Sequence, residues 1–194
     1  MSDEPETHDQ SEDAKSDQLV LLARHDRAAF SELYDRYYPR VSKYCLRRLF
    51  NRTIAEDVLS EVFLQVATHI GTFPGKTETD FRRWLFRIAT NSINAYLRQT
   101  LRRNELMEEV ARYRSASASD RTVTENLSLE WGEVFQRLME LEERDRTIIS
   151  LRFFAEFTYE DIANVIDSTP GAVRTSLSRT LSRMREHFAT RNKS

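Results

Sequence analysis

The sequence predicts an all-α protein with two small helical domains, a helical bundle and a helix-turn-helix unit, joined by a flexible linker. Only 4 Gly and 4 Pro occur among 194 residues, which argues against a loop-rich β fold. Apolar residues recur at three- and four-residue steps, and no stretch keeps the alternation of a strand. Residues 113–126 are small and polar, as is typical of a linker between two such parts.

Composition limits the possible classes of function. The single cysteine, Cys45, excludes a disulfide framework or a Cys-based zinc site and fits a reducing compartment. The four histidines are scattered without the spacing of ligands, so we expect no metal and no other cofactor. No apolar run approaches the roughly 20 residues of a membrane span, and the acidic N-terminus is unlike a signal peptide. We therefore expect a cytoplasmic protein.

Charge is unevenly distributed along the chain, although the formal net charge is only −2. Residues 1–17 carry seven acidic side chains against one lysine. Residues 81–103 carry six arginines and no acid, and residues 171–185 carry four arginines and no acid. One basic stretch alone is usually a solvated helix face. Two of them, one in each half of the chain, favour an anionic partner.

The N-terminal half predicts an acidic tail and then three helices. Residues 1–17 have almost no apolar content and are expected to be disordered. The helical pattern begins at Gln18, and Pro39 is expected to kink or break the first helix. Thr53 is the predicted cap of the second helix, with Glu56 closing a capping box. A third helix follows a loop, and its apolar side consists of Phe81, Trp84, Leu85, Ile88, Ala89 and Leu97.

Residues 158–188 predict two helices joined by a tight turn. Thr158 and Asp161 form a capping box that opens the first helix. Thr169 caps the second helix, and Pro170 occupies its first position, where a missing N–H costs nothing. The outer face of the second helix presents Arg174, Thr175, Ser178, Arg179 and Ser182.

This arrangement is a helix-turn-helix, in which the second helix enters the major groove of DNA. Arginine can bind guanine through two hydrogen bonds, and small hydroxyl side chains suit either bases or phosphates. Gly171 and Ala172 have little bulk, which allows close packing or the close approach of a phosphate. A helical hairpin with a solvated basic face is the alternative interpretation of the same pattern.

Two blocks of sequence resemble extracytoplasmic-function sigma factors of RNA polymerase. Residues 138–186 resemble region 4 of that family, and they read LMELEERDRTIISLRFFAEFTYEDIANVIDSTPGAVRTSLSRTLSRMRE. Residues 28–103 resemble region 2, notably through AEDVLSEVFLQV at 55–66 and FRRWLFRIATNSINAYLRQTLRR at 81–103. Both blocks occur in the order and spacing of the family, so the resemblance is specific.

The resemblance implies four segments and their partners. Residues 1–17 are an acidic tail, 18–103 form region 2, 104–126 form the linker, and 127–190 form region 4. Region 2 would dock on the clamp of core RNA polymerase and recognise the −10 element of promoter DNA. Region 4 would dock on the flap and recognise the −35 element. Control is expected from a separate anti-sigma protein or from transcription of the chain's own gene.

The resemblance also implies which side chains form each contact. Asp57, Glu61 and Phe63 would bind polymerase, and Trp84, Arg87 and Asn91 would contact the −10 element. Helical spacing places a row of polar residues on one side of that −10 helix, namely Arg83, Arg87, Asn91, Asn94 and Arg98. The residues expected to read the −35 element are Arg174, Thr175, Ser178 and Arg179.

Several alternatives stay open for these residues. Trp84 and Phe63 could belong to the core, and Asp57 and Glu61 could be solvated charges. The sequence also departs from the family at Ser60, where glutamine is usual, and at Ser176, where a basic residue is common. The loop between Phe73 and Phe81 is about two residues longer than usual, which leaves its base specificity open.

The function that follows is recruitment of polymerase to promoters and assistance in opening them, without enzymatic activity. A helix-turn-helix regulator that acts without polymerase is the main alternative, but it leaves residues 18–103 unexplained. A nucleic-acid enzyme is disfavoured because the sequence offers no carboxylate cluster, His/Cys ligand set or Gly-rich phosphate loop.

Overall fold

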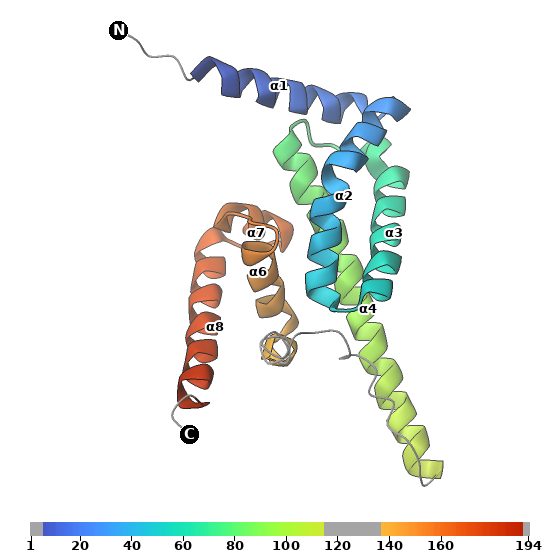
Figure 1. The fold of residues 1–194 in the computed structure, drawn as a ribbon, viewed down its shortest axis with the longest axis vertical. Helices are drawn as coiled ribbons and strands as arrows, with labels where there is room; N and C mark the ends of the chain where they lie inside the picture. Colours follow the sequence, from blue (N-terminus) through green and yellow to red (C-terminus); the bar gives the residue numbers. More distant parts are fainter. Residues whose placement is uncertain (1–5, 115–136, 192–194) are drawn as a thin grey trace.

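The computed structural model describes residues 6–114 and 137–191, and Figure 1 shows their arrangement. Every regular element within these two ranges is a helix, and neither range contains a strand. The predicted all-α class with two helical domains is therefore confirmed. None of the described helices is long and apolar enough to cross a membrane.

The N-terminal domain is a bundle of three long helices with a fourth across one end. Helices α2 (Arg27–Leu49), α3 (Arg52–His69) and α4 (Glu78–Arg114) form the bundle, and α1 (Glu6–Leu22) contacts both α2 and α4. A short 3-10 turn, η1 (Ile70–Thr72), follows α3 and leads into the loop before α4. Figure 1 shows α1 lying across the top of the bundle.

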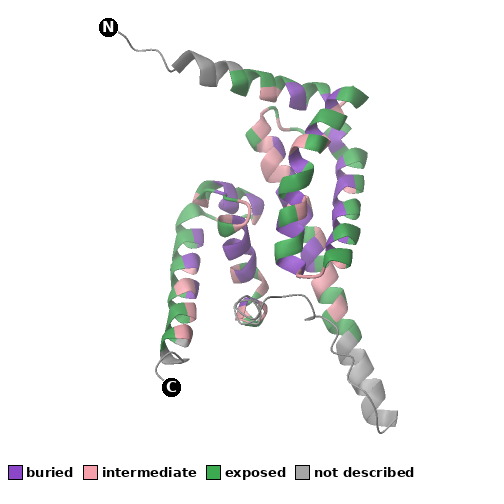
Figure 2. Ribbon diagram, viewed as in Figure 1, coloured by how far each residue is buried: buried purple, intermediate pink, exposed green. Residues whose placement is uncertain are grey.

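The C-terminal domain contains α6 (Glu143–Phe153), α7 (Tyr159–Val165) and α8 (Pro170–Arg191). Both α6 and α7 pack against α8, while α7 also packs against α4 of the N-terminal domain. Figure 1 shows α8 as the outermost of these helices. Its polar side therefore faces away from the bundle, as Figure 2 shows by the exposed residues along it.

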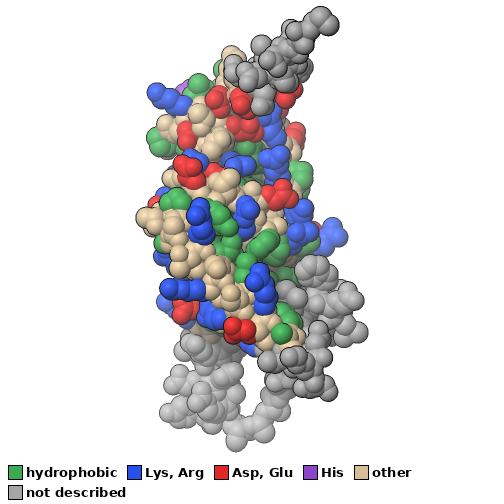
Figure 3. Space-filling model, turned by 90° about the vertical axis from the view of Figure 1, so that its left-hand side faces the viewer, with side chains coloured by type: hydrophobic (Ala, Val, Ile, Leu, Met, Phe, Trp, Pro, Cys, Tyr) green, Lys and Arg blue, Asp and Glu red, His purple; other side chains and the backbone are tan. Residues whose placement is uncertain are grey.

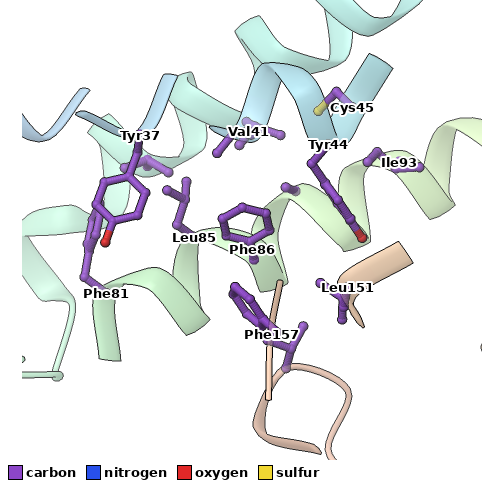
Figure 4. Packing of buried hydrophobic residues seen from close by; sticks show 14 of the residues in the cluster. Tyr37, Val41, Tyr44, Cys45, Phe81, Leu85, Phe86, Ile93, Leu151 and Phe157 are labelled. Atoms are coloured by element: carbon purple, nitrogen blue, oxygen red, sulfur yellow. The ribbon is translucent and has the colours of Figure 1, made fainter. Parts of the chain in front are cut away.

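The two domains share one hydrophobic core. Tyr44 of α2 packs edge-on against Phe86 of α4, with ring centroids 5.3 Å apart. Phe86 in turn contacts Phe157, which precedes α7, at 4.9 Å. Figure 4 shows Phe157 and Leu151 of the C-terminal domain lying beneath Phe86. All four side chains are 2 % exposed or less, so the contact between the domains excludes water.

The local signals of the helix-turn-helix are confirmed. Asp161 donates its backbone N–H to the Thr158 hydroxyl at 3.1 Å, and the Asp161 carboxylate accepts from the Thr158 backbone at 3.2 Å. Thr169 accepts a hydrogen bond from the backbone of Ala172 at 3.2 Å, as an N-cap does. Val173 on the predicted apolar stripe is fully buried.

The prediction of disorder for residues 1–17 was wrong for residues 6–17, which belong to α1. Contacts with distant residues stabilise this helix where its composition does not. Asp17 accepts a hydrogen bond of 2.7 Å from the backbone N–H of Glu78, one of the groups that the start of α4 leaves without an intrahelical partner. Ser16 accepts a hydrogen bond of 3.0 Å from Arg36 of α2.

Two further details of the N-terminal domain differ from the prediction. Asn51, and not Thr53, caps α3, because its side chain accepts a hydrogen bond of 3.0 Å from the first helical turn. Glu56 pairs instead with Arg52 at 2.8 Å. Pro39 lies inside α2 without breaking it. The buried side chains on either side of Pro39 hold the two halves of the helix in the core.

Helix α4 extends beyond the predicted start of the linker and ends at Arg114. Residues 104–112 (NELMEEVAR) are mostly strong helix formers, which explains the extension. The rest of the predicted linker, and residues 127–136 of predicted region 4, lie outside the described residues.

Candidate nucleic-acid interface

Helix α8 presents the four predicted −35 residues to solvent. Val173 and Leu177 anchor the opposite side of α8 in the core. Figure 3 views the molecule from the side on which α8 lies in Figure 1 and shows Lys and Arg side chains along that face. A Cβ added to Gly171 would meet no other atom within 4 Å, so the space in front of it is open to a ligand. The exposed residues on this face include Arg174, Thr175, Ser178 and Arg179.

An open groove of about 880 Å³ runs between the start of α6 and the outer side of α8. Asp145 lines this groove and links α6 to α8, because its carboxylate accepts hydrogen bonds from Ser176 and, at 2.7 Å, from Arg183. Ser176 therefore holds α8 to α6 where a basic residue is common in the family. Arg144 also lines the groove and donates to Ser168 at 2.6 Å. Neither Arg144 nor Arg183 was among the predicted DNA contacts.

The two predicted arginines of this face have different surroundings. The guanidinium of Arg174 lies 5.3 Å from the centre of the Tyr159 ring, a cation–π contact that orients it. Arg179 has no ion-pair partner within the described part of the chain and lines the groove. Arg179 is thus the side chain of the groove that is most available to a base or a phosphate.

The predicted polymerase-binding residues lie on α3 but do not all face outward. Asp57 and Glu61 are exposed. Phe63 is only 8 % exposed, and its ring packs at 4.6 Å from Tyr34. The alternative interpretation of Phe63 as a core residue is therefore the one that the fold supports. Leu64 is 62 % exposed beside Glu61 and was missed, because its neighbours in the sequence give no sign of which apolar residue turns outward.

The three arginines among the predicted −10 residues of α4 share one side of the helix, and that side faces the C-terminal domain. Arg83 forms an ion pair of 2.8 Å with Asp161. Further along α4, two more ion pairs join Arg87 to Asp167 at 2.8 Å and Arg98 to Glu143 at 2.7 Å. Arg82, which was not predicted as a contact, also pairs with Asp161 at 3.0 Å.

The other predicted −10 residues differ in exposure. Asn91 is exposed, but Asn94 is 8 % exposed and accepts a hydrogen bond of 2.6 Å from Arg48. Asn94 is therefore a buried polar contact in this conformation and not a surface residue. Trp84 is partly buried and stacks on Phe73 at 4.7 Å, so part of its ring packs with the core.

The loop before α4 is held in one conformation by its own side chains. Phe73 is buried, and a Cβ at Gly75 would overlap the Phe73 ring, so only glycine fits there. Asp80 accepts hydrogen bonds from the backbone of Lys76 at 3.1 Å and of Thr77 at 3.2 Å. The guanidinium of Arg24 donates to the carbonyl of Gly75. These contacts fix the conformation of the loop next to Trp84.

The side chain of Asp161 is buried although it is an acidic group. Its burial alone raises the pKa, but hydrogen bonds from Arg83 and Thr158 and the charge of Arg82 outweigh this and hold the pKa below the ordinary 3.8. A lowered carboxyl pKa stabilises the fold above the unfolded value of about 3.9, and this stabilisation is lost as the pH falls through the folded value. Asp161 therefore carries its charge at neutral pH.

Two buried arginines lie near the contact between the domains. Arg48 is 2 % exposed, and its Nε and Nη1 atoms have no hydrogen-bond partner among the described residues. Burial lowers the pKa of both Arg48 and Arg146, and the charge of Arg48 lowers that of Arg146 further. The sequence patterns did not show that Arg48 and Arg146 are buried, because their burial depends on how α2, α4 and α6 pack together.

A helix-turn-helix with an exposed polar groove, next to a second helical domain that carries a row of arginines, is typical of a DNA-binding protein. Residues 33–103 match Sigma-70 region 2, and residues 137–186 match Sigma-70 region 4. The chain belongs to the extracytoplasmic-function (ECF) family of RNA polymerase sigma factors. It directs RNA polymerase, and the family is a class of non-catalytic initiation factors.

Relatives of the chain match it over most of their length. An ECF RNA polymerase sigma-E factor of Haemophilus influenzae is 35% identical over 174 residues, which is 84% of this chain and 90% of the relative. The ECF sigma factor SigW of Bacillus subtilis is 27% identical over 169 residues, covering 83% of this chain and 89% of that protein.

Solved structures share the fold. The structure of CnrH in complex with the cytosolic domain of CnrY has a TM-score of 0.67 and 20% identity, covering 90% of this chain and 97% of CnrH. The sigma factor RpoE in complex with the anti-sigma factor NepR from Bartonella quintana has a TM-score of 0.59 and 19% identity, covering 81% of this chain and 94% of RpoE.

Proposed function

We propose that this sigma factor uses three separate surfaces to start transcription. Helix α3 docks on the clamp of core polymerase, α4 captures the −10 element, and α8 reads the −35 element. The groove between α6 and α8 supports the proposal most directly, because it is open, lined by arginines and short hydroxyl side chains, and formed by a helix-turn-helix.

Docking on polymerase would use the outer side of α3. Asp57 and Glu61 offer two carboxylates one helical turn apart, and Leu64 adds an exposed apolar side chain beside them. Charged and apolar groups together suit a partner surface with basic and apolar groups, where the charges give specificity and the apolar area gives affinity.

Promoter opening would follow from capture of unstacked bases by α4. Unstacking a base costs a few kcal/mol, and stacking on aromatic side chains with arginine contacts to the backbone can offset this cost. Trp84 and the arginines of α4 supply both kinds of contact. The segment between the domains would set the distance between the two promoter elements.

Control by a separate protein is part of the proposal. One solved structure with the same fold holds CnrH in complex with the cytosolic domain of CnrY, and another holds the sigma factor RpoE in complex with the anti-sigma factor NepR. A comparable anti-sigma partner would bind this chain in the cytoplasm, where core polymerase works. Run-off transcription with purified core polymerase, followed by mapping of start sites, tests the function as a whole.

The double substitution Asp57→Ala, Glu61→Ala is expected to weaken binding to core polymerase by at least about tenfold, since it removes both carboxylates of the docking side. Fluorescence anisotropy with labelled sigma factor measures the affinity, and circular dichroism checks that helicity is kept. Glu56→Ala is the matched control, because Glu56 is exposed on the same helix but pairs with Arg52. Unchanged affinity of the double variant would show that α3 is not the docking helix.

The substitution Arg87→Ala is expected to reduce promoter opening by the holoenzyme about five- to tenfold, because one guanidinium contact to the −10 strand is lost. Permanganate reactivity of thymines in the −10 element measures the opening. Arg103→Ala is the control, since Arg103 is exposed on α4 and lies about 150° around the helix from the middle of the predicted −10 row. If both variants open the promoter like the unmodified protein, α4 does not contact the −10 strand.

A further inference from the structure

Two side chains at the C-terminal end of α1 reach the loop that leads into α4, and Figure 1 shows this loop beneath α1. We propose that these residues, Asp17 and Arg24, are positioning residues for recognition of the −10 element. They hold the loop of residues 73–80 beside Trp84 and thereby set which base the holoenzyme prefers at one −10 position. This inference rests on the proposed role of α4. It adds a role for α1, to which the proposed function assigns no contact with DNA or polymerase.

Arg24 holds the middle of the loop. Its guanidinium donates a hydrogen bond to the carbonyl oxygen of Gly75 and lies 5.8 Å from the centre of the Phe73 ring. The backbone comes close as well, because a Cβ added to Gly71 would lie 3.8 Å from the carbonyl oxygen of Arg24. A charged donor makes a stronger hydrogen bond than a neutral one, and the ring contact orients the guanidinium further. Arg24 therefore links the end of α1 to both the backbone and the aromatic side chain of the loop.

Asp17 holds the end of the loop. Its carboxylate accepts a hydrogen bond of 2.7 Å from the backbone N–H of Glu78, the first residue of α4. A helix start leaves such N–H groups unpaired and favours a negative charge. The loop supplies a cap of its own, in which the Thr77 hydroxyl accepts from the Asp80 backbone at 3.0 Å and the Asp80 carboxylate accepts from the Thr77 backbone at 3.2 Å. The start of α4 thus depends on α1 as well as on the loop.

The end of α1 is itself fixed against α2, so it can support the loop. Glu78 accepts a hydrogen bond of 3.0 Å from the hydroxyl of Tyr37 and forms an ion pair of 3.4 Å with Arg36. Arg36 also donates to Ser16 of α1 at 3.0 Å. Val20 of α1 is fully buried. One connected set of contacts therefore joins α1, α2 and the start of α4.

The loop determines what a base would meet beside Trp84. Phe73 of the loop is buried and stacks on the Trp84 ring, with the centroids 4.7 Å and the planes 29° apart. Trp84 is partly exposed, and the neighbouring loop residues Pro74 and Lys76 are exposed. A captured base is recognised by stacking on a ring and by hydrogen bonds to its edge. A shift of the loop would therefore change which base fits beside Trp84.

The contacts from α1 oppose the flexibility of the loop. Residues 73–77 lie between η1 and α4 and have no regular secondary structure. Fixing such residues in one conformation costs conformational entropy, which the hydrogen bonds of Arg24 and Asp17 offset in part. Without them the loop would sample more conformations next to Trp84, so more than one base would be accepted there. The expected effect is a loss of discrimination and not a uniform loss of activity.

Base preference is the measurement that separates this role from a loss of stability. Arg24→Ala and Asp17→Ala are assayed as holoenzymes by run-off transcription from promoters that carry each base at every −10 position. We expect the ratio between the best and the worst base to fall about three- to tenfold at one −10 position. The preferences at the −35 element should stay unchanged. Asp17→Asn keeps an oxygen that can accept from the Glu78 N–H, so we expect it to retain the original preference.

Trp84 fluorescence follows the loop in the absence of DNA. The chain has one other tryptophan, Trp131, so a Trp131→Phe background isolates the emission of Trp84. We expect Arg24→Ala to shift this emission to longer wavelength, because release of Phe73 would expose more of the Trp84 ring to water. Circular dichroism and urea unfolding check that each variant is folded.

Arg27→Ala and Asp13→Ala are the matched controls, since both side chains are exposed and lie close in sequence to the tested pair. Equal relaxation in these controls would overturn the proposal in favour of a general effect of charge. An unchanged preference, or an equal loss at every base, in Arg24→Ala and Asp17→Ala would also overturn it. The role of α4 would then still stand if Arg87→Ala impairs promoter opening. If Arg87→Ala has no effect either, the proposed role of α4 fails and this inference fails with it.

Discussion

Replacing Phe157 with alanine is expected to lower the free energy of unfolding by about 3–5 kcal/mol. The Phe157 side chain is fully buried at the point where the two domains share their core. Alanine there would remove the ring contact with Phe86 and the cation–π contact with Arg82, and it would leave a cavity between α4 and α7. Urea unfolding followed by circular dichroism measures the change.

Phe153 provides the control for this substitution. It is an aromatic residue of the same domain but is 50 % exposed, so Phe153→Ala is expected to change stability by no more than about 0.5 kcal/mol. A loss below about 1 kcal/mol for Phe157→Ala would contradict the shared core. It would mean that the two domains are separate in solution and that α7 does not cover α4.

The elements that the sequence predicts best depend on residues close together in the chain. The capping box of Thr158 and Asp161 and the cap at Thr169 join residues three positions apart, and the starts of α7 and α8 follow from them and from Pro170. The helical state of residues 6–17 depends on contacts over longer distances. Asp17 binds Glu78, which is 61 positions away, so composition alone suggested disorder.

The same distinction explains the outcome for the −10 residues. Spacing placed Arg83, Arg87 and Arg98 on one side of a helix, because the helical repeat is fixed at 3.6 residues per turn. The carboxylates that cover them lie between 45 and 80 positions further along the chain. No periodicity links such distant residues, so the sequence showed the arginine row but not its partners.

The sequence patterns also did not show which apolar side chains of α3 are exposed. Phe63 and Leu64 are adjacent and both apolar, yet one is buried and the other is exposed. The difference comes from Tyr34 and Tyr38 of α2, which fill the space around the Phe63 ring. Any partner of α3 would therefore meet Leu64 first, and Phe63 would act by holding the helix in place.

The recognition helix gives the second large expected effect. If Arg179 reads a guanine, Arg179→Ala should cost about 1–3 kcal/mol of binding free energy at the −35 element and relax the preference at one base position. Arg179 is exposed in the groove and has no ion-pair partner within the described residues. Thr175 and Ser178 beside it are short, which lets the helix approach the base edges closely.

A contact with phosphate would give a different result for the same substitution. The loss would then be uniform across −35 sequences, and the slope of affinity against salt would fall by about one unit. Binding to a panel of −35 mutants at two salt concentrations separates the two cases. Arg185→Ala is the control, because Arg185 is exposed on α8 but does not line the groove. If Arg179→Ala behaves like Arg185→Ala at every site and salt concentration, the groove between α6 and α8 does not read the −35 element.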